Sequence, residues 1–560
     1  MSAPDSPSRR MMRAASQSEP WRANPFHRRR LGDAAPDRIL AWGADPRVGD
    51  AARGREFGAG IWRVGAERLA GEHALPWDAP HPSPHFTARL HTFNWLIDLA
   101  TVGPSANNRI ADLFDSWVER YGEWDEVAWD PELTAKRLFA WLTWGRPAFE
   151  MGAAEQRLAL MQSAGRHARL LMLAENELSE RHLGSIKAGA ALILAANAGF
   201  PDAERLREQG EELLIEACAK QFQPDGGHMS RSPEALAEAL FDLLTAHDAL
   251  PDPSPLLQDS LPKLANMLRM LRLGDGGLAC FHGGSEGWTA SIDAAFARIG
   301  GDVRSFQFAN HSGFQRLEAG PLRVVFDVGG APPLPYSDRA HASALAFELS
   351  SETERLIVNV GAARELAPAA RMAARATNGH STLALNDALS ATFVEPRRGK
   401  GPPQLIGPNL DDVRRSSDES GITVQGRHDG YRNAFGLLHR RYIFIDHMGT
   451  NLRGIEELIR PVKQKGGPFK GRIVYVVRFH LHPNVRTRLI EHQMALLETP
   501  NGQRWRLRTD APNIAIEPSI YWGGRVLAES HQIVLTGQAD PMGHGLSPPN
   551  RIRWALARAT

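Results

Sequence analysis

The sequence predicts a two-part α+β chain, an α-helical half followed by an antiparallel β-sandwich half. Between about residues 86 and 300, apolar residues recur every three or four positions, as on one face of a helix. After about residue 303 they alternate with polar residues, as in a half-buried strand. With 560 residues the chain is also too long for one ordinary core. The change of period places the boundary between the halves near residue 300.

The helical half consists of amphipathic segments separated by short turns that contain Gly, Pro or Asp. Ser232 followed by Pro233 favours a helix start, because Ser caps the first turn and Pro suits its first position. Serial helix pairs of this length are typical of stacked antiparallel hairpins, arranged as a bundle, a solenoid or a closed toroid. The segments with a helical period are 86–100, 109–122, 132–144, 157–178, 182–199, 202–222, 232–250 and 260–273.

The second half contains short segments of period two, separated by turns rich in Gly, Pro, Asn and Asp. Strands that recur at roughly 10-residue spacing indicate an antiparallel sandwich. We therefore expect a tail at 1–50, a helical domain at 51–300 and a sandwich domain at 301–560. The segments that alternate are 322–329, 342–350, 354–361, 381–387, 471–483, 503–510 and 531–537.

Composition limits the classes of partner. Lys and Arg number 65 against 64 Asp and Glu, so there is no overall basic field and no nucleic-acid partner is expected. The two cysteines cannot form a disulfide framework. The sequence contains no run of 18 apolar residues, so no transmembrane segment is predicted. Residues 1–30 contain seven Arg and no apolar core after Arg9 and Arg10, which favours a basic disordered tail and a cytoplasmic location.

Five segments carry a resemblance to a known family. They are QFQPDGGHMSRSP (221–233), RAHASALAFELSSETERLIVNVG (339–361), ATNGHSTLALND (376–387), RHDGY (427–431) and RFHLHP (478–483). With these five segments in this order along the sequence, the chain resembles the heparinase II/III-like polysaccharide lyases. The resemblance implies an incomplete (α/α) toroid followed by an antiparallel β-sandwich, and it favours the periplasm or cell envelope as the location.

The resemblance also implies a reaction. Such lyases cleave an acidic polysaccharide or oligosaccharide by β-elimination at a uronic acid. The difficult step removes a proton α to a carboxylate, so the carboxylate must be neutralised by Asn, Gln, His or Arg. A Tyr or His acts as the base, and a Tyr often protonates the leaving oxygen. No cofactor is required for this chemistry.

The expected substrate-binding residues come from the helical half. Where the family has an Asn-His pair, this chain has Arg181 and His182, and an Arg also neutralises a carboxylate. Arg231 belongs to the RSP motif. Trp141 is a possible wall for a sugar ring, with burial in the core as the alternative. A helix-start contact is the alternative for Arg181.

The expected catalytic residues are His228, Tyr336, Arg339 and His341. His228 follows two glycines, which favours a tight turn that aims its ring. The family's His-x-His turn is Arg339-x-His341 here. The family's tyrosine after the RSP motif is replaced by Ala235. Tyr336, five residues before His341, is therefore the best remaining phenol.

A second phenol candidate is Tyr431, which lies in the RHDGY turn, whereas Tyr442 and Tyr475 stand in apolar strands and are expected in the core. The sequence contains only Tyr121, Tyr336, Tyr431, Tyr442, Tyr475 and Tyr521. A shortage of phenols thus makes the family's usual mechanism questionable for this chain.

A structural zinc is a further expectation from the resemblance. Its ligands would be His341, Asn359 and His380, although Asn in place of Asp lacks the negative charge. Without a metal, the two histidines would be hydrogen-bonded between strands.

Three functions compete at this point. The first is a lyase that acts on an acidic glycan of the cell envelope. The second is a non-catalytic glycan-binding protein on the same fold, favoured by the missing tyrosines. The third is a cytosolic scaffold that uses its helical surface for protein contacts.

Overall fold

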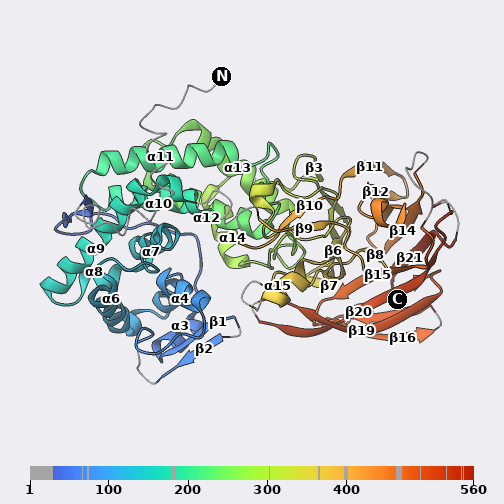
Figure 1. Ribbon diagram of the computed structural model, residues 1–560, viewed down its shortest axis with the longest axis horizontal. Coiled ribbons are helices and arrows are strands. Elements are labelled where there is room, and N and C mark those ends of the chain that lie inside the picture. The colour runs from blue at the N-terminus through green and yellow to red at the C-terminus, as the bar shows by residue number, and fades with distance from the viewer. Residues whose placement is uncertain are drawn as a thin grey trace. The chain divides into compact units, whose positions relative to one another are not determined.

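The computed structural model describes residues 30–559, apart from a set of short gaps. The chain divides into two compact units (Figure 1). Unit 1 is Met1–Lys220 with Phe241–Gln258, and unit 2 is Gln221–Leu240 with Asp259–Thr560. The gaps are 66, 72–74, 179–182, 302, 364–365, 367, 397–400, 462–468, 492, 525, 544 and 546–547.

Unit 1 consists of helices and one small hairpin, and polar side chains cap several of its helix starts. The side chain of Asp50 accepts the backbone N–H of Ala52 at 2.9 Å, and Asp130 accepts that of Glu132 at 2.9 Å. Such caps satisfy backbone donors that have no partner within the helix. The elements are α3 (Ala51–Gly58), β1 (Ile61–Val64), β2 (Glu67–Ala70), α4 (Pro84–His91), α5 (Leu96–Thr101), α6 (Asn107–Tyr121), α7 (Pro131–Trp144), α8 (Arg146–Glu150), α9 (Ala154–Leu173), α10 (Gly184–Asn197) and α11 (Ala203–Lys220).

Two helices each span a boundary between the two units. They are α12 (Pro233–Ala249) and α13 (Pro255–Met270). The predicted helix start at Ser232 is confirmed, because α12 begins at Pro233 and Ala235 donates its N–H to Ser232 Oγ at 3.4 Å.

The described part of the predicted N-terminal tail packs within unit 1. Gly43 donates its N–H to the carbonyl of Leu142 at 2.9 Å, and Arg47 forms an ion pair with Asp242 at 2.7 Å. Leu31 is buried. Residues 30–50 are therefore part of the folded unit, whereas the rest of the predicted tail, 1–29, lies outside the described residues.

Unit 2 contains two antiparallel sheets and the short helices α14 (Thr289–Ile299), α15 (Pro368–Arg375) and α16 (Arg432–Phe435). Sheet I has the order β19-β20-β15-β7-β6-β5-β4-β3, with β8 also paired to β15. Its strands are β3 (Phe308–Ala309), β4 (Phe314–Ala319), β5 (Leu322–Asp327), β6 (Phe347–Ser351), β7 (Glu354–Val358), β8 (Leu383–Leu385), β15 (Ile473–Leu481), β19 (Asn513–Tyr521) and β20 (Ala528–Ala539).

Sheet II has the order β11-β12-β13-β14-β21-β18-β17-β16, and several of its strands are seen in orange and red in Figure 1. Its strands are β11 (Leu410–Asp418), β12 (Gly421–His428), β13 (Leu438–Asp446), β14 (Asn451–Ile459), β16 (Arg486–Glu491), β17 (Met494–Glu498), β18 (Arg504–Thr509) and β21 (Arg551–Arg558). A separate pair joins β9 (Thr392–Val394) to β10 (Gln404–Ile406).

One continuous hydrophobic core contains apolar residues of both sheets. Phe326 and Leu349 come from sheet I, and Ile443 and Leu507 come from sheet II. Along β18 the predicted alternation is clear, because Trp505 and Leu507 are buried while their neighbours are exposed. The helical and sheet-forming halves thus form an α+β multidomain chain. No helix among the described residues has the length and apolarity needed to cross a bilayer.

Candidate functional site

His228 lies in a tight turn between α11 and α12, as the two preceding glycines predict. Gly226 has φ +87°, and a Cβ there would collide with the carbonyl oxygen of Lys263. The turn is closed by the N–H of Gln223, which donates to the carbonyl of Gly227 at 2.7 Å. Phe222 and His228 face each other in an isolated β-bridge. This geometry fixes where the imidazole points.

The hydrogen bonds of His228 determine its tautomer. The backbone N–H of Ser230 points at Nδ1 of His228 at 3.2 Å, so Nδ1 accepts and the proton resides on Nε2. The side chain is 1% exposed, and Nε2 has no hydrogen-bond partner among the described residues. Burial lowers the pKa of His228 to about 3, so the ring is neutral at physiological pH. His228 therefore holds a buried, unsatisfied N–H donor.

Tyr336 lies beside this imidazole. It belongs to the short 3-10 helix Leu334–Tyr336, is buried, and packs edge-on against His228 with 5.8 Å between ring centroids. Arg375 at the end of α15 holds the following turn, donating to the carbonyls of Ala340 at 2.8 Å and Ser337 at 3.2 Å. The fold thus brings together two predicted residues that lie 108 positions apart in the sequence.

Arg231 is part of the scaffold of this site. Its backbone has φ +59°, and its guanidinium forms an ion pair with Asp327 at 2.5 Å. Nε donates to the carbonyl of Ser312 at 2.7 Å, and the two terminal nitrogens donate to the carbonyls of Gly330 at 2.7 Å and Gly313 at 3.0 Å. The predicted substrate clamp therefore commits its donors to the protein, which fixes the start of α12 against the end of β5.

Asp327 and His282 complete the buried cluster around Arg231. Burial favours a raised carboxyl pKa, but Arg231 and the contact with His282 hold the pKa of Asp327 below its usual range. Ser343 donates to Asp327 Oδ2 at 2.7 Å. The N–H of His341 points at Nδ1 of His282 at 3.3 Å, and Nε2 of His282 lies 3.0 Å from Nη1 of Arg231 and 3.3 Å from Oδ2 of Asp327. Sequence reasoning missed Asp327 and His282. Two signals were available: Asp327 ends a strand shortly before two glycines, and His282 directly precedes two glycines.

His341 and His380 form a hydrogen-bonded pair between turn and strand. His380 Nδ1 donates to the carbonyl of Ala376 at 2.8 Å, so its Nε2 accepts from Nδ1 of His341 at 3.0 Å. This assignment leaves the lone pair of His341 on Nε2. Burial lowers the pKa of His380 to about 3. The His380 ring therefore acts as a neutral hydrogen-bonding group.

The donors at these positions do not fit a zinc site. The Asn359 Oδ1 atom accepts the N–H of Ser381 at 3.0 Å, and the Asn359 amide donates to the carbonyl of Cys280 at 3.4 Å. No carboxylate joins the two imidazoles, and the part of the chain that is described contains no cluster of three His, Cys, Asp or Glu suited to a metal.

The remaining predicted residues differ in their surroundings. Arg339 is exposed on the turn that carries His341. Trp141 is 0% exposed and packs among aromatic rings of unit 1, 5.3 Å from Trp117, so it presents no face to a sugar. Arg181 and His182 lie outside the described residues.

Tyr431, the second phenol candidate, is a core residue. It is 0% exposed and donates to the carbonyl of Leu383 at 2.7 Å. Burial raises its pKa well above the ordinary range.

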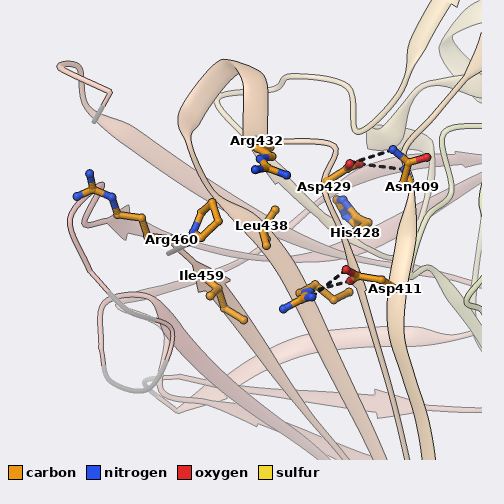
Figure 2. A pocket seen from close by; sticks show the side chains of 10 residues that line it. Asn409, Asp411, His428, Asp429, Arg432, Leu438, Ile459 and Arg460 are labelled. Carbon is orange, nitrogen blue, oxygen red and sulfur yellow. Dashed lines mark hydrogen bonds and ion pairs between the residues drawn. The ribbon is translucent and has the colours of Figure 1, made fainter. Parts of the chain in front are cut away.

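A pocket of about 330 Å³ lies at one end of sheet II (Figure 2). Its charged groups are largely paired with each other. Arg427 makes two bonds of 2.8 Å to Asp411, and Asn409 makes bonds of 2.9 and 3.0 Å to Asp429. The lining residues are Asn409, Asp411, Arg427, His428, Asp429, Arg432, Leu438, Ile459, Arg460 and Pro461.

The buried end of this pocket leads into a hydrogen-bond chain. His428 accepts the N–H of Gly430 at 3.1 Å, so its Nε2 donates to His439 at 3.1 Å, and His439 donates to Glu456 at 2.7 Å. Glu456 also pairs with Arg441 at 2.8 Å. Both ring nitrogens of His428 are therefore engaged. At the His228 site, by contrast, one ring nitrogen has no partner among the described residues and lies beside a phenol.

Comparisons with known proteins agree with this architecture. The sequence profile described as "Heparinase II/III-like, C-terminal" matches residues 301–555. The chain is 34% identical to "FtsZ-localized protein C" of Caulobacter vibrioides (strain NA1000 / CB15N) over 556 residues, which covers 96% of this chain and 93% of that protein.

Among solved structures, the fold is similar to that of heparinase III. The TM-score is 0.67 at 12% identity, covering 92% of this chain and 85% of that one. It is also similar to that of heparan sulfate lyase HepC from Pedobacter heparinus, with a TM-score of 0.54 at 14% identity, covering 95% of this chain and 87% of that one. At this identity the likeness shows the fold alone. From the matched profile, the full-length relative and the shared fold, the chain belongs to the heparinase II/III-like family.

Proposed function

We propose that this chain cleaves an acidic, uronic-acid-containing glycan by β-elimination at the site formed by His228, Tyr336 and His341. The supporting observation is the unsatisfied Nε2–H of buried His228 beside the phenol of Tyr336. A buried donor without a partner costs free energy that a bound ligand recovers. In this proposal the helical half is the incomplete (α/α) toroid of the lyase architecture.

Each residue has a distinct role in the proposed reaction. The neutral His228 donates its Nε2–H to the uronate carboxylate, and exposed Arg339 brings a positive charge to the same group. The lone pair on Nε2 of His341 accepts the proton α to the carboxylate. Tyr336 protonates the leaving oxygen as the C–O bond breaks and the C=C bond forms. Arg231 positions the His228 turn without touching the substrate.

The test is the rise in ultraviolet absorbance of an unsaturated product when uronic-acid polymers are supplied. We expect His228→Gln and Tyr336→Phe to lower kcat at least tenfold. Tyr442→Phe is the matched control, because Tyr442 lies on β13 outside this cluster. A broad panel of uronic-acid polymers that gives no product over pH 5–9 overturns the proposal.

A non-catalytic glycan-binding protein is the second candidate. The observation that favours it is Arg231, whose guanidinium is committed to Asp327 and backbone carbonyls. In that case glycan binding survives Tyr336→Phe and His341→Ala, and the wild type shows no turnover. Equilibrium binding measured alongside the absorbance assay separates the two candidates.

The location of the chain is a further part of the proposal. The relative that is 34% identical over nearly the full length is named for its localisation to FtsZ. We infer that this chain localises with FtsZ as well. A fluorescent fusion imaged together with FtsZ tests this, and a uniform distribution that ignores FtsZ contradicts it.

A further inference from the structure

The outer face of sheet II carries a group of unpaired arginines, here called the arginine face. It consists of Arg453 on β14, Arg506 and Arg508 on β18, and Arg486 and Arg488 on β16, all exposed. On β18, Trp505 and Leu507 alternate with these arginines and enter the core. Because successive side chains of a strand point to opposite faces, the arginines point outward.

The strand register places three of these arginines on either side of β21, where the outward side chains between them are small alanines. Arg453 and Arg508 both stand opposite Ala555 of β21, one on each side. Arg506 stands opposite Ala557 in the next row of the same face. Strands two apart are about 10 Å apart, and residues i and i+2 about 7 Å, so these three guanidinium groups border the alanines of β21. On β16, Arg488 stands opposite Leu496 and Arg486 opposite Glu498 of β17.

The charges of this face are not neutralised within the protein. Other arginines of sheet II have acidic partners, as in Arg504–Glu498 at 2.9 Å and Arg553–Asp510 at 2.8 Å. The members of the arginine face form no ion pair within the described ranges. Arg453 lies over the ring of Phe444, 5.6 Å from its centroid. The chain's net charge of +1 therefore conceals one strongly basic surface.

We propose that the arginine face is a docking surface for an acidic polysaccharide, separate from the His228 site. The choice of ligand rests on the proposed function. Repeated carboxylates complement repeated guanidinium groups, and the small alanines of β21 let a polymer approach the sheet closely. A long glycan held here presents further sugars to the protein and raises their local concentration.

The sheet topology favours a glycan over an acidic peptide. β21 lies between β14 and β18, and β18 lies between β21 and β17, so the backbones of both strands are hydrogen-bonded on both sides. A peptide therefore cannot pair its main chain with β18 or β21, and of the strands that carry the arginines only β16, at the edge of sheet II, has a side without a ladder. At Arg453, Arg506 and Arg508, recognition of a ligand's carboxylates and hydroxyls therefore depends on side chains.

The experiment measures fluorescence anisotropy of labelled polygalacturonate with the full chain at two salt concentrations. We expect Arg506→Glu/Arg508→Glu to weaken binding at least tenfold and to reduce its salt dependence. Arg506→Gln/Arg508→Gln should give an intermediate loss, and unfolding midpoints verify that both variants fold. Arg55→Glu/Arg68→Glu changes the net charge equally at exposed positions of unit 1 and should bind like the wild type.

Three outcomes overturn the proposal. One is unchanged binding by Arg506→Glu/Arg508→Glu, and another is an equal loss in the Arg55→Glu/Arg68→Glu control. The third is an affinity for poly-L-glutamate equal to that for polygalacturonate, which assigns the face to acidic peptides. Elimination from short oligosaccharides should be unchanged in the Arg506→Glu/Arg508→Glu variant. If no elimination occurs in any chain, the proposed function fails while the binding comparison still decides this inference.

Discussion

At the residue scale, the ion pair of Arg231 with Asp327 is the most consequential contact of the candidate site. Both side chains are buried, and removal of one partner leaves the other charge unpaired in the interior. We expect Asp327→Asn to lower the free energy of unfolding by about 3–5 kcal/mol at pH 7. Ser343→Ala removes one hydrogen bond to the Asp327 carboxylate but no charge, and should cost about 1.5 kcal/mol.

The pH dependence of that pair has a definite sign. The folded pKa of Asp327 lies below its unfolded value, so its contribution is complete above about pH 4 and is lost as the pH falls through the folded pKa. Urea unfolding at pH 7 and pH 3 measures this. Equal stability losses for Asp327→Asn and Ser343→Ala at pH 7 would contradict the assignment.

Glu348 on β6 predicts the opposite pH dependence. Burial raises its pKa from 4.5 to about 7, although Arg355 acts against the shift. Because the folded chain then binds more protons than the unfolded chain, its stability falls as the pH rises from about 4.5 to 7, by about 3 kcal/mol. Glu348→Gln has no charge to bury, so we expect its stability relative to the wild type to increase over this range. Unfolding midpoints at pH 5 and pH 8 test this, and a constant difference between the two proteins would refute it.

At the element scale, helix α15 acts as the clamp of the Tyr336 turn. Arg375 donates to the carbonyls of Ser337 and Ala340, and also to that of Pro403 at 2.8 Å. A lysine cannot make these divergent bonds, because it lacks the planar fork of donors. We expect Arg375→Lys to increase hydrogen exchange in residues 334–342 and to lower glycan turnover severalfold.

The control for this helix is Arg371→Lys. Arg371 donates to the carbonyl of Leu366 and does not hold the turn. Exchange in residues 334–342 should remain at the wild-type level in this control. Identical exchange in both variants would mean that the turn is held by other contacts.

The helices and strands of this chain could be predicted from the sequence more fully than its candidate functional site. The alternation along β18 and the Ser232 cap depend on neighbouring residues, and local patterns encode them. The role of Arg231 depends on carbonyls about 80–100 positions away, at Ser312, Gly313 and Gly330, which no local pattern contains. Trp141 shows the same limit, since only the tertiary packing decides that it is a core residue.

At the scale of the whole molecule, each compact unit is made of two separate stretches of the sequence, so no single boundary divides the chain. The family profile begins at residue 301, but unit 2 also includes Gln221–Leu240 and the chain from Asp259 onward. These earlier segments supply buried partners to the sheets. Arg316 on β4 donates to the carbonyl of Met270 at 2.9 Å, and Arg355 on β7 donates to that of Leu278 at 3.0 Å.

This organisation predicts how fragments of the chain fold. A fragment of residues 301–560 lacks Arg231, so Asp327 loses its cationic partner and two buried arginines lose their carbonyl acceptors. Each buried polar group without a partner costs about 1–3 kcal/mol, which together approaches the whole stability of a domain. We expect 301–560 to show no cooperative urea transition by tryptophan fluorescence, whereas 221–560 should unfold cooperatively. A shared transition midpoint for the two fragments would mean that sheets I and II suffice for folding, and that the segments before residue 301 serve the site rather than the fold.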